Sequence, residues 1–137
     1  MFGDSMKKIH AYLYTGKNKN MDQYCMVLVN SDGVQVDFFD GEVRGSVEVK
    51  ALAQLIMEYG SYAITLYTIS DKFFHILNEK KYEKYTNSEW LILKTYLKNH
   101  TLGVKKLLRE NAFIEKAKNI LYEKNSSARG WTVRTEA

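Results

Sequence analysis

Three acidic residues stand where this sequence could hold a divalent metal ion. Asp40 opens the loop phrase DGEVRG, Glu48 begins the helical pattern that follows it, and Asp71 comes just after an apolar run. Mg²⁺ prefers hard oxygen ligands such as carboxylates, and a pair of these ions can generate a hydroxide and stabilise a leaving oxygen. A metal-dependent hydrolytic site would need Glu48 together with at least two of Asp40, Asp71 and Glu115.

No other set of residues has the spacing of a catalytic or metal site. The three histidines, His10, His75 and His100, lie far apart, and the sequence contains no Ser/His/Asp set, zinc-binding spacing or phosphate-binding glycine loop. The single cysteine, Cys25, lies inside an apolar strand pattern and cannot form an internal disulfide. We therefore interpret it as buried and chemically inert.

Two basic stretches in the second half of the chain could contact nucleic acid. They supply the candidate nucleic-acid-binding residues Lys80, Lys81, Lys84, Lys105, Lys106 and Arg109. In the first stretch Tyr82 and Tyr85 lie among the lysines. Lysines contact phosphates without regard to sequence, and tyrosine rings stack on bases. The alternative interpretation is that these lysines are solvated helix surfaces and the tyrosines are packing residues.

The charge is unevenly distributed along the chain. Residues 1–78 carry 7 Lys/Arg and 9 Asp/Glu, a net charge of −2, whereas residues 79–137 carry 13 and 7, a net charge of +6. A basic half is compatible with a nucleic-acid contact and also with solvated helices.

The length of 137 residues suits one domain with its own core. We expect this domain at residues 1–124 and a flexible C-terminal tail at 125–137. No apolar run approaches the roughly 18–20 residues that span a bilayer, and the N-terminus MFGDSMKKIH has no apolar signal core. We therefore expect a cytoplasmic protein that does not bind membranes.

The hydrophobic pattern predicts an α/β fold. Three strand-like segments joined by short polar turns come first, and they indicate an antiparallel meander at 8–15, 24–30 and 34–39. A helix follows, with Leu52, Leu55, Ile56 and Tyr59 on one face. The apolar run 62–69 then predicts a parallel strand buried on both faces. Further helices are expected at about 71–84, from 88 and at about 111–124, with a short fifth strand within 102–109.

The third strand carries its own burial prediction. Val34, Val36 and Phe38 alternate with the polar residues Gln35 and Asp37. This alternation predicts a half-buried strand with its apolar side toward the core.

The order and lengths of these elements resemble the ribonuclease H-like fold, a mixed five-stranded sheet of three antiparallel strands followed by parallel strands, with helices on both faces. The resemblance covers about residues 7–124. The first and fourth strands of that family often end in a Tyr-Thr-Asp type of phrase, and LYTG at 13–16 and LYTI at 66–69 stand in those places. The family's last helix begins with a pattern that is similar to NAFIEKAK at 111–118.

The resemblance implies four metal-binding carboxylates, most of which this sequence lacks. The family's acids fall, in chain order, on Gly16, Glu48, Ile69, and Ile114 or Glu115. If Ala117 marks the core direction of the last helix, Ile114 takes the position that faces the site and Glu115 points to solvent. Glu48 is therefore a vestigial candidate, and we assign no catalytic residue.

Three functions follow from this pattern. The first is a catalytically inactive ribonuclease H-like domain that binds nucleic acid, such as RNA–DNA hybrid or duplex RNA, without a cofactor. The second is a protein-interaction, inhibitor or adaptor protein of a phage or mobile element on the same scaffold. The third is a metal-dependent nuclease with a relocated site of Asp40, Glu48 and Asp71, which would need Mg²⁺. Because the acids are missing, we expect that the chain is not an enzyme.

Overall fold

The computed structural model of the chain describes residues 7–107 and 111–136, with side chains described as far as Ser126. The elements are β1 (Lys8–Asn18), β2 (Met21–Val29), β3 (Gln35–Val43), α1 (Val47–Tyr59), β4 (Ala63–Thr68), α2 (Asp71–Asn78), α3 (Ser88–Leu97), β5 (Gly103–Lys106) and α4 (Ala112–Glu136). Within these residues, no helix combines the length and the apolar character that crossing a membrane requires.

The five strands form one mixed sheet in the order β3-β2-β1-β4-β5. β1, β2 and β3 pair in antiparallel fashion, while β4 runs parallel to β1 and β5 runs parallel to β4. This is the mixed sheet that the sequence predicted, and the ambiguous segment 102–109 does contribute its short fifth strand.

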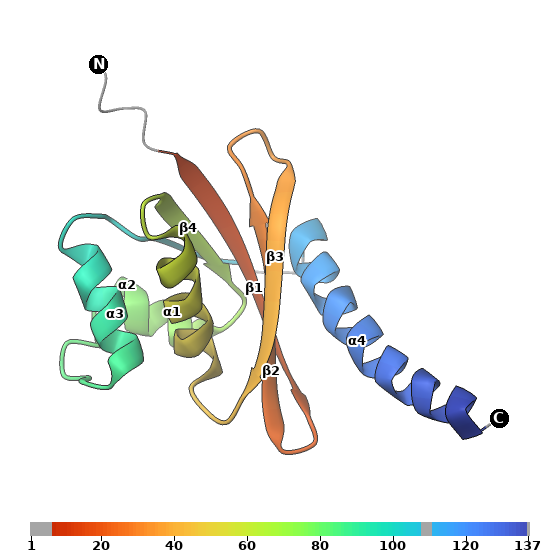
Figure 1. The fold of residues 1–137 in the computed structure, drawn as a ribbon. Coiled ribbons are helices and arrows are strands. Elements are labelled where there is room, and N and C mark those ends of the chain that lie inside the picture. Colours follow the sequence, from red (N-terminus) through yellow and green to blue (C-terminus); the bar gives the residue numbers. More distant parts are fainter. Residues whose placement is uncertain (1–6, 108–110, 137) are drawn as a thin grey trace.

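Helices cover the two faces of the sheet unequally. α1, α2 and α3 lie on one face, which we call the three-helix face, and α4 lies alone on the other, the α4 face (Figure 1). The larger core lies on the three-helix face, where Leu13 of β1 packs in one cluster with Leu52 and Leu55 of α1. A smaller cluster on the α4 face joins Val27 of β2 to Leu121 of α4.

The strand β4 is buried on one face rather than on both as predicted. Its residues on the three-helix face are buried: Ile64, Leu66 and Thr68. Its residues on the α4 face are only half-buried: Ala63, Thr65 and Tyr67. The reason is that α4 packs mainly against β1 and β2, so β4 has a helical cover on one side only.

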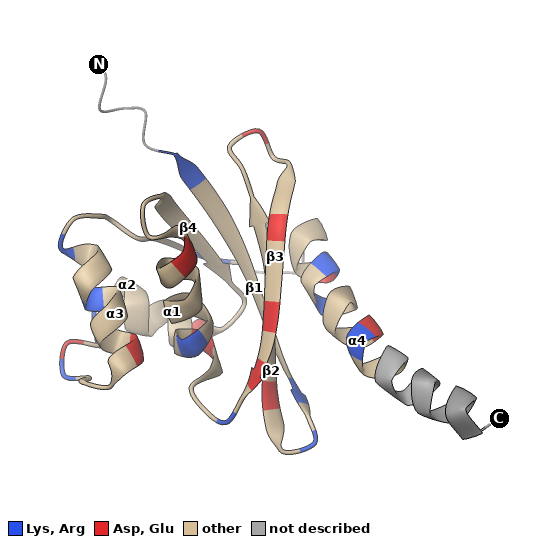
Figure 2. Ribbon diagram, in the orientation of Figure 1, with Lys and Arg blue, Asp and Glu red and all other residues tan. Residues whose placement is uncertain are grey.

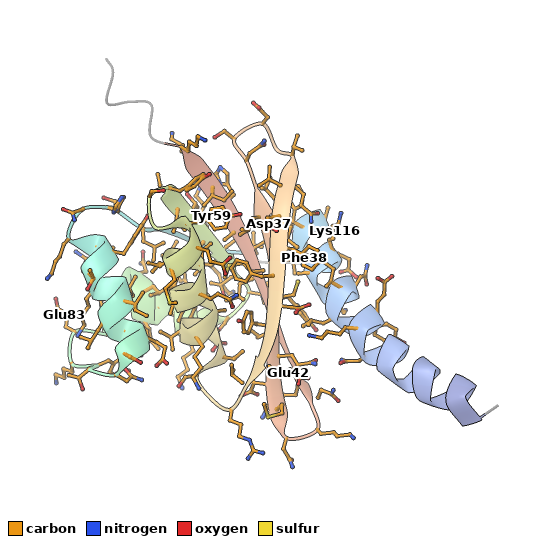
Figure 3. All side chains as sticks on the ribbon, in the orientation of Figure 1. Asp37, Phe38, Glu42, Tyr59, Glu83 and Lys116 are labelled. Atoms are coloured by element: carbon orange, nitrogen blue, oxygen red, sulfur yellow. The ribbon has the colours of Figure 1, made fainter. Side chains whose placement is uncertain are left out.

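The alternating apolar side chains of the edge strand β3 point away from the larger core, contrary to the prediction. Val36 and Phe38 are 51% and 45% exposed. Phe39 packs against the core of the three-helix face instead, and Asp37 accepts a 2.8 Å hydrogen bond from the Tyr59 hydroxyl (Figure 3). α4 packs mainly over β1 and β2 and meets β3 through the ion pair of Lys124 with Asp40, so the Phe38 side of this strand is covered only in part.

Two helices differ in length from the prediction. α2 ends at Asn78 rather than near residue 84, because Lys80 adopts a left-handed φ of 55° that a right-handed helix cannot include. α4 continues to Glu136, through the segment that was expected to be a flexible tail. That segment contains no proline, and a lone glycine such as Gly130 costs a helix only about 1 kcal/mol.

Candidate functional site at the end of β4

A groove opens at the carboxyl end of β4, between the starts of α1 and α2 and the segment that leads into α3. Its volume is about 660 Å³. The charged residues that line it are Glu48, Lys72 and Lys84. Its polar and aromatic lining comes from Ser46, Ser70, Tyr85, Thr86, Asn87 and Trp90. The groove therefore combines one carboxylate with two cations and several hydrogen-bonding groups.

Glu48 reaches this groove because the chain turns sharply before α1. Gly45 and Ser46 adopt positive φ values of 71° and 49°, and α1 begins immediately afterwards. The carboxylate thus lies in the first turn of α1, where negative charge stabilises the helix dipole. It is half-buried, and no hydrogen bond or ion pair joins it to another described residue. Glu48 is consequently available to a ligand.

The start of α2 forms the opposite wall of the groove. Ser70 is the N-cap of α2, and its hydroxyl accepts a 3.2 Å hydrogen bond from the Phe73 backbone N–H. Asp71, which was named as a weak candidate metal ligand, pairs instead with Lys106 at the end of β5, with an Nζ–Oδ1 distance of 3.1 Å. The carboxylate of Asp71 is therefore already balanced by a cation.

The three acids of the predicted relocated site do not come together. Asp40 pairs with Lys124 of α4 at 3.1 Å, on the α4 face, whereas Glu48 lines the groove beside α1 and α2 on the other face. Within residues 7–107 and 111–126, no group of three or more His, Cys, Asp or Glu side chains could hold a metal ion. These residues do not fit a pair of Mg²⁺ ions, which need several carboxylates around them.

The two strand ends that the resemblance singles out are near each other but carry no acid. β1 pairs with β4 so that Leu13 lies beside Thr68. Tyr14 follows Leu13 and Ile69 follows Thr68, and Gly16 lies two residues beyond Tyr14 on β1. A Cβ atom at Gly16 would meet only the ring of Tyr14, at 3.6 Å, so the backbone leaves room there for a larger side chain.

The start of α4 supplies no clear ligand either. Asn111 precedes the helix, and its side-chain oxygen accepts a 2.9 Å hydrogen bond from the Ile114 backbone N–H. Ile114 and Ala117 are both fully buried, as the helical pattern predicted. Glu115 is half-buried rather than solvent-facing, and it interacts with a neighbouring group.

Among the candidate nucleic-acid-binding residues, Lys84 lies in the groove itself. Lys106 lies close to its α2 wall through the contact with Asp71. Lys72, which was not predicted from the sequence, also lines the groove and has no ion-pair partner within the described residues. Lys72 is a single cation outside the two basic stretches. The one sequence signal that could have identified it is its position two residues after Ser70, the N-cap of α2.

The other candidates lie elsewhere. Lys80 lines a different groove between α2 and α3, and Lys81 pairs with Glu79 at 3.0 Å. Lys105 is exposed on β5, and Arg109 lies outside the described residues. The predicted basic residues are thus spread over several surfaces.

No family model matches the sequence, and no curated protein matches it. The structure is similar to several ribonuclease H structures. RNase H1 from the halophilic archaeon Halobacterium salinarum has a TM-score of 0.58 at 19% identity, over 82% of this chain and 92% of that one. The N-terminal RNase H domain of rv2228c from Mycobacterium tuberculosis has a TM-score of 0.59 at 12% identity, over 90% and 98%. LC11-RNase H1 in complex with RNA/DNA hybrid has a TM-score of 0.56 at 16% identity, over 80% and 92%.

At these identities the likeness is one of fold. The chain has the ribonuclease H-like fold that the order of its elements predicted.

Proposed function

We propose that this chain is a catalytically inactive ribonuclease H-like domain that binds nucleic acid through the groove at the end of β4. The observation that carries the proposal is the charge of that groove, which combines Lys72 and Lys84 with the single carboxylate of Glu48. A two-metal nuclease needs several carboxylates at such a place, whereas lysines are suited to phosphate contacts.

An aromatic side chain at the same groove supports the proposal. Tyr85 is 40% exposed, and its ring lies 5.0 Å from the buried ring of Trp90, which supports it from behind. A supported and exposed ring can stack on a base or a sugar without a large loss of side-chain entropy. We infer that Tyr85 stacks against the bound strand while Lys72 and Lys84 contact its phosphates.

The first experiment measures binding and cleavage in the same samples. Fluorescence anisotropy with labelled RNA–DNA hybrid, duplex RNA, duplex DNA and single strands, with Mg²⁺ present and at two salt concentrations, is followed by gel analysis. RNA–DNA hybrid comes first because LC11-RNase H1 was solved with that ligand. We expect salt-dependent binding and intact nucleic acid.

A double variant locates the binding site. Replacing Lys72 and Lys84 by glutamate should weaken hybrid binding by about tenfold or more at low salt and lower the salt slope by about two. Lys50→Glu and Lys98→Glu together form the control, with the same charge change on residues that do not line this groove. Equal losses in both double variants would contradict a binding site in the groove.

Glu48→Gln separates the proposed function from the nuclease alternative. If the groove only binds, removing a negative charge near the phosphates should tighten hybrid binding by about two- to fivefold at low salt. In an active nuclease with a relocated site, the same variant should abolish cleavage. Cleavage by the wild type that Glu48→Gln removes would overturn the assignment of inactivity.

A protein-interaction role is the second candidate function, and the edge strand β3 favours it. Val34, Val36 and Phe38 are all about half exposed along this edge, and exposed apolar edge strands are sites where other chains add. Light scattering tests this role directly. Phe38→Ser should dissociate any assembly that is found while leaving nucleic-acid affinity unchanged.

A further inference from the structure

A second surface with binding chemistry lies across the sheet from the groove. Beside α4, on the face of the sheet that this helix covers only in part, β1, β4 and β5 carry a set of residues that we call the aromatic face: Lys8, His10, Tyr12, Thr65, Tyr67, Gly103 and Lys105. All but Gly103 carry polar or aromatic side chains, and none of them is acidic.

The rings of this face form an ordered stack. Tyr12 and Tyr67 lie nearly parallel, with ring centroids 4.3 Å apart and an angle of 5° between the planes. Phe113 of α4 contacts the ring of Tyr12 at 5.0 Å. The Tyr67 hydroxyl is hydrogen-bonded to His10 Nδ1 at 3.1 Å, which holds its ring in place. The stack is therefore fixed before any ligand arrives.

The stack ends at Tyr67, on the side of β5. Gly103 lies opposite Thr65 and Lys105 lies opposite Tyr67 in the parallel register. Gly103 has no side chain, and Lys105 is exposed, so the only side chain that β5 places beside Tyr67 is a long cation. Lys8 is exposed at the other end of the face, and neither lysine forms an ion pair within the described residues.

We propose that this aromatic face binds single-stranded nucleic acid, with a base continuing the stack on Tyr67 and with Lys105 and Lys8 contacting the phosphates. Single strands suit such a surface because their bases are free to stack, whereas the bases of a duplex are covered. The charge of the face is complementary to a phosphate backbone. The site extends the proposed function to a second surface and does not depend on the groove.

The first test separates stacking from charge on the wild-type protein. The probes are a fluorescein-labelled DNA single strand of about ten nucleotides and an abasic strand of the same length, which carries the same phosphates without bases. We expect the abasic strand to bind at least about tenfold more weakly, because it has no base to stack on Tyr67. Equal affinities, or no binding of either strand at low salt, would overturn the proposal.

Variants then place the strand on this face. Tyr67→Phe keeps the ring and should retain binding within about twofold, whereas Tyr67→Leu removes the ring and should weaken it about tenfold. Lys105→Glu should also weaken binding, while Lys98→Glu, an equal charge change at the end of α3, should do so less. If Tyr67→Leu does not fold, the single-strand affinities of Lys105→Glu and Lys98→Glu are compared instead. Equal losses in these two variants would contradict binding at the aromatic face.

The same variants distinguish the two sites. Changes at Lys72 and Lys84 should weaken hybrid binding and leave the affinity for the single strand unchanged. Changes at Tyr67 and Lys105 should weaken single-strand binding and leave the affinity for the hybrid unchanged. If single-strand affinity falls only in the groove variants, the proposed binding site on the aromatic face is wrong and the proposed function of the groove remains. Single-strand binding that needs Tyr67, without any hybrid binding, overturns the proposed groove alone.

Discussion

The two faces of the sheet differ in how completely helices cover them. On the three-helix face, the inward residues of the two central strands are buried without exception, from Ile9 to Leu13 in β1 and from Ile64 to Thr68 in β4. On the α4 face, one helix packs mainly on β1 and β2, and it leaves the outer parts of that face half-buried or exposed. The sheet itself is therefore more accessible on the α4 face than on the three-helix face.

The two edge strands of the sheet also differ in charge. β3 carries only acidic charged residues, Asp37, Asp40 and Glu42 (Figure 2). β5, at the other edge of the sheet, carries only the cations Lys105 and Lys106. A polyanion would therefore be repelled from one edge and attracted to the other. Nucleic acid bound as proposed would therefore approach the β5 side of the sheet, and the β3 edge would be left for a different partner.

Neighbouring residues of β4 test the difference in coverage most strongly. Leu66 is fully buried on the three-helix face, whereas Thr65 is half-buried on the α4 face. We expect Leu66→Ala to lower the free energy of unfolding by about 2–5 kcal/mol and Thr65→Ala to lower it by less than about 1 kcal/mol. Urea unfolding followed by circular dichroism measures both. Similar losses in the two variants would mean that the two sides of β4 are equally covered.

A smaller effect is expected where α4 crosses the β1–β2 hairpin. The Gln23 amide is buried and exchanges hydrogen bonds with the Asn125 amide at 3.0 and 3.1 Å, and it also donates one to Glu42 at 2.6 Å. Asn125→Ala would leave the buried Oε1 of Gln23 without this donor, while Nε2 would keep its hydrogen bond to Glu42, so we expect a loss of about 1–3 kcal/mol. Asn119→Ala, on an exposed part of the same helix, is the control and should change stability by less than about 0.5 kcal/mol.

Much of the fold could be predicted because it depends on local patterns. The period-2 and period-3.6 patterns predicted the order of the elements, and short polar turns predicted the meander. Cys25 was expected to be buried and inert, and burial raises the pKa of its thiol to about 12. The side of β3 that faces the core was predicted wrongly. The alternation of Val36 and Phe38 is real, but coverage depends on where α4 packs, and a strand's own sequence does not contain that information.

The candidate site was harder to predict because it is made of residues distant in the chain. Glu48 and Lys84 were both named from the sequence, but only the packing of α1 against the α2–α3 segment brings them into one groove. Asp71 was named as a metal candidate, yet its pairing with Lys106 depends on how β5 aligns with β4. The aromatic face could not be anticipated for the same reason, since Tyr12 and Tyr67 meet only through strand register.

The alkaline stability of the protein tests how far the ring of Tyr12 is buried in the aromatic face. Burial, followed by the charge and hydrogen bond of Tyr67, raises the pKa of Tyr12 to about 12, above the value of about 10 in an unfolded chain. The neutral form is therefore favoured in the folded state. The resulting stabilisation is complete below pH 10 and is lost as the pH rises from about 10 through 12, because the unfolded chain ionises first. Urea midpoints between pH 9 and 11.5 should fall less steeply in Tyr12→Phe than in the wild type.

Tyr122→Phe is the matched control for this measurement, because it removes the same hydroxyl group from an exposed tyrosine on α4, outside the aromatic face. The raised pKa values of Cys25 and Tyr59 act equally in all three proteins and cancel in the comparison. If Tyr12→Phe keeps the wild-type slope, the Tyr12 hydroxyl ionises as it does in water. The stack on the α4 face would then be as open to solvent as the edge of β3, and the aromatic face and the β3 edge would differ in charge alone.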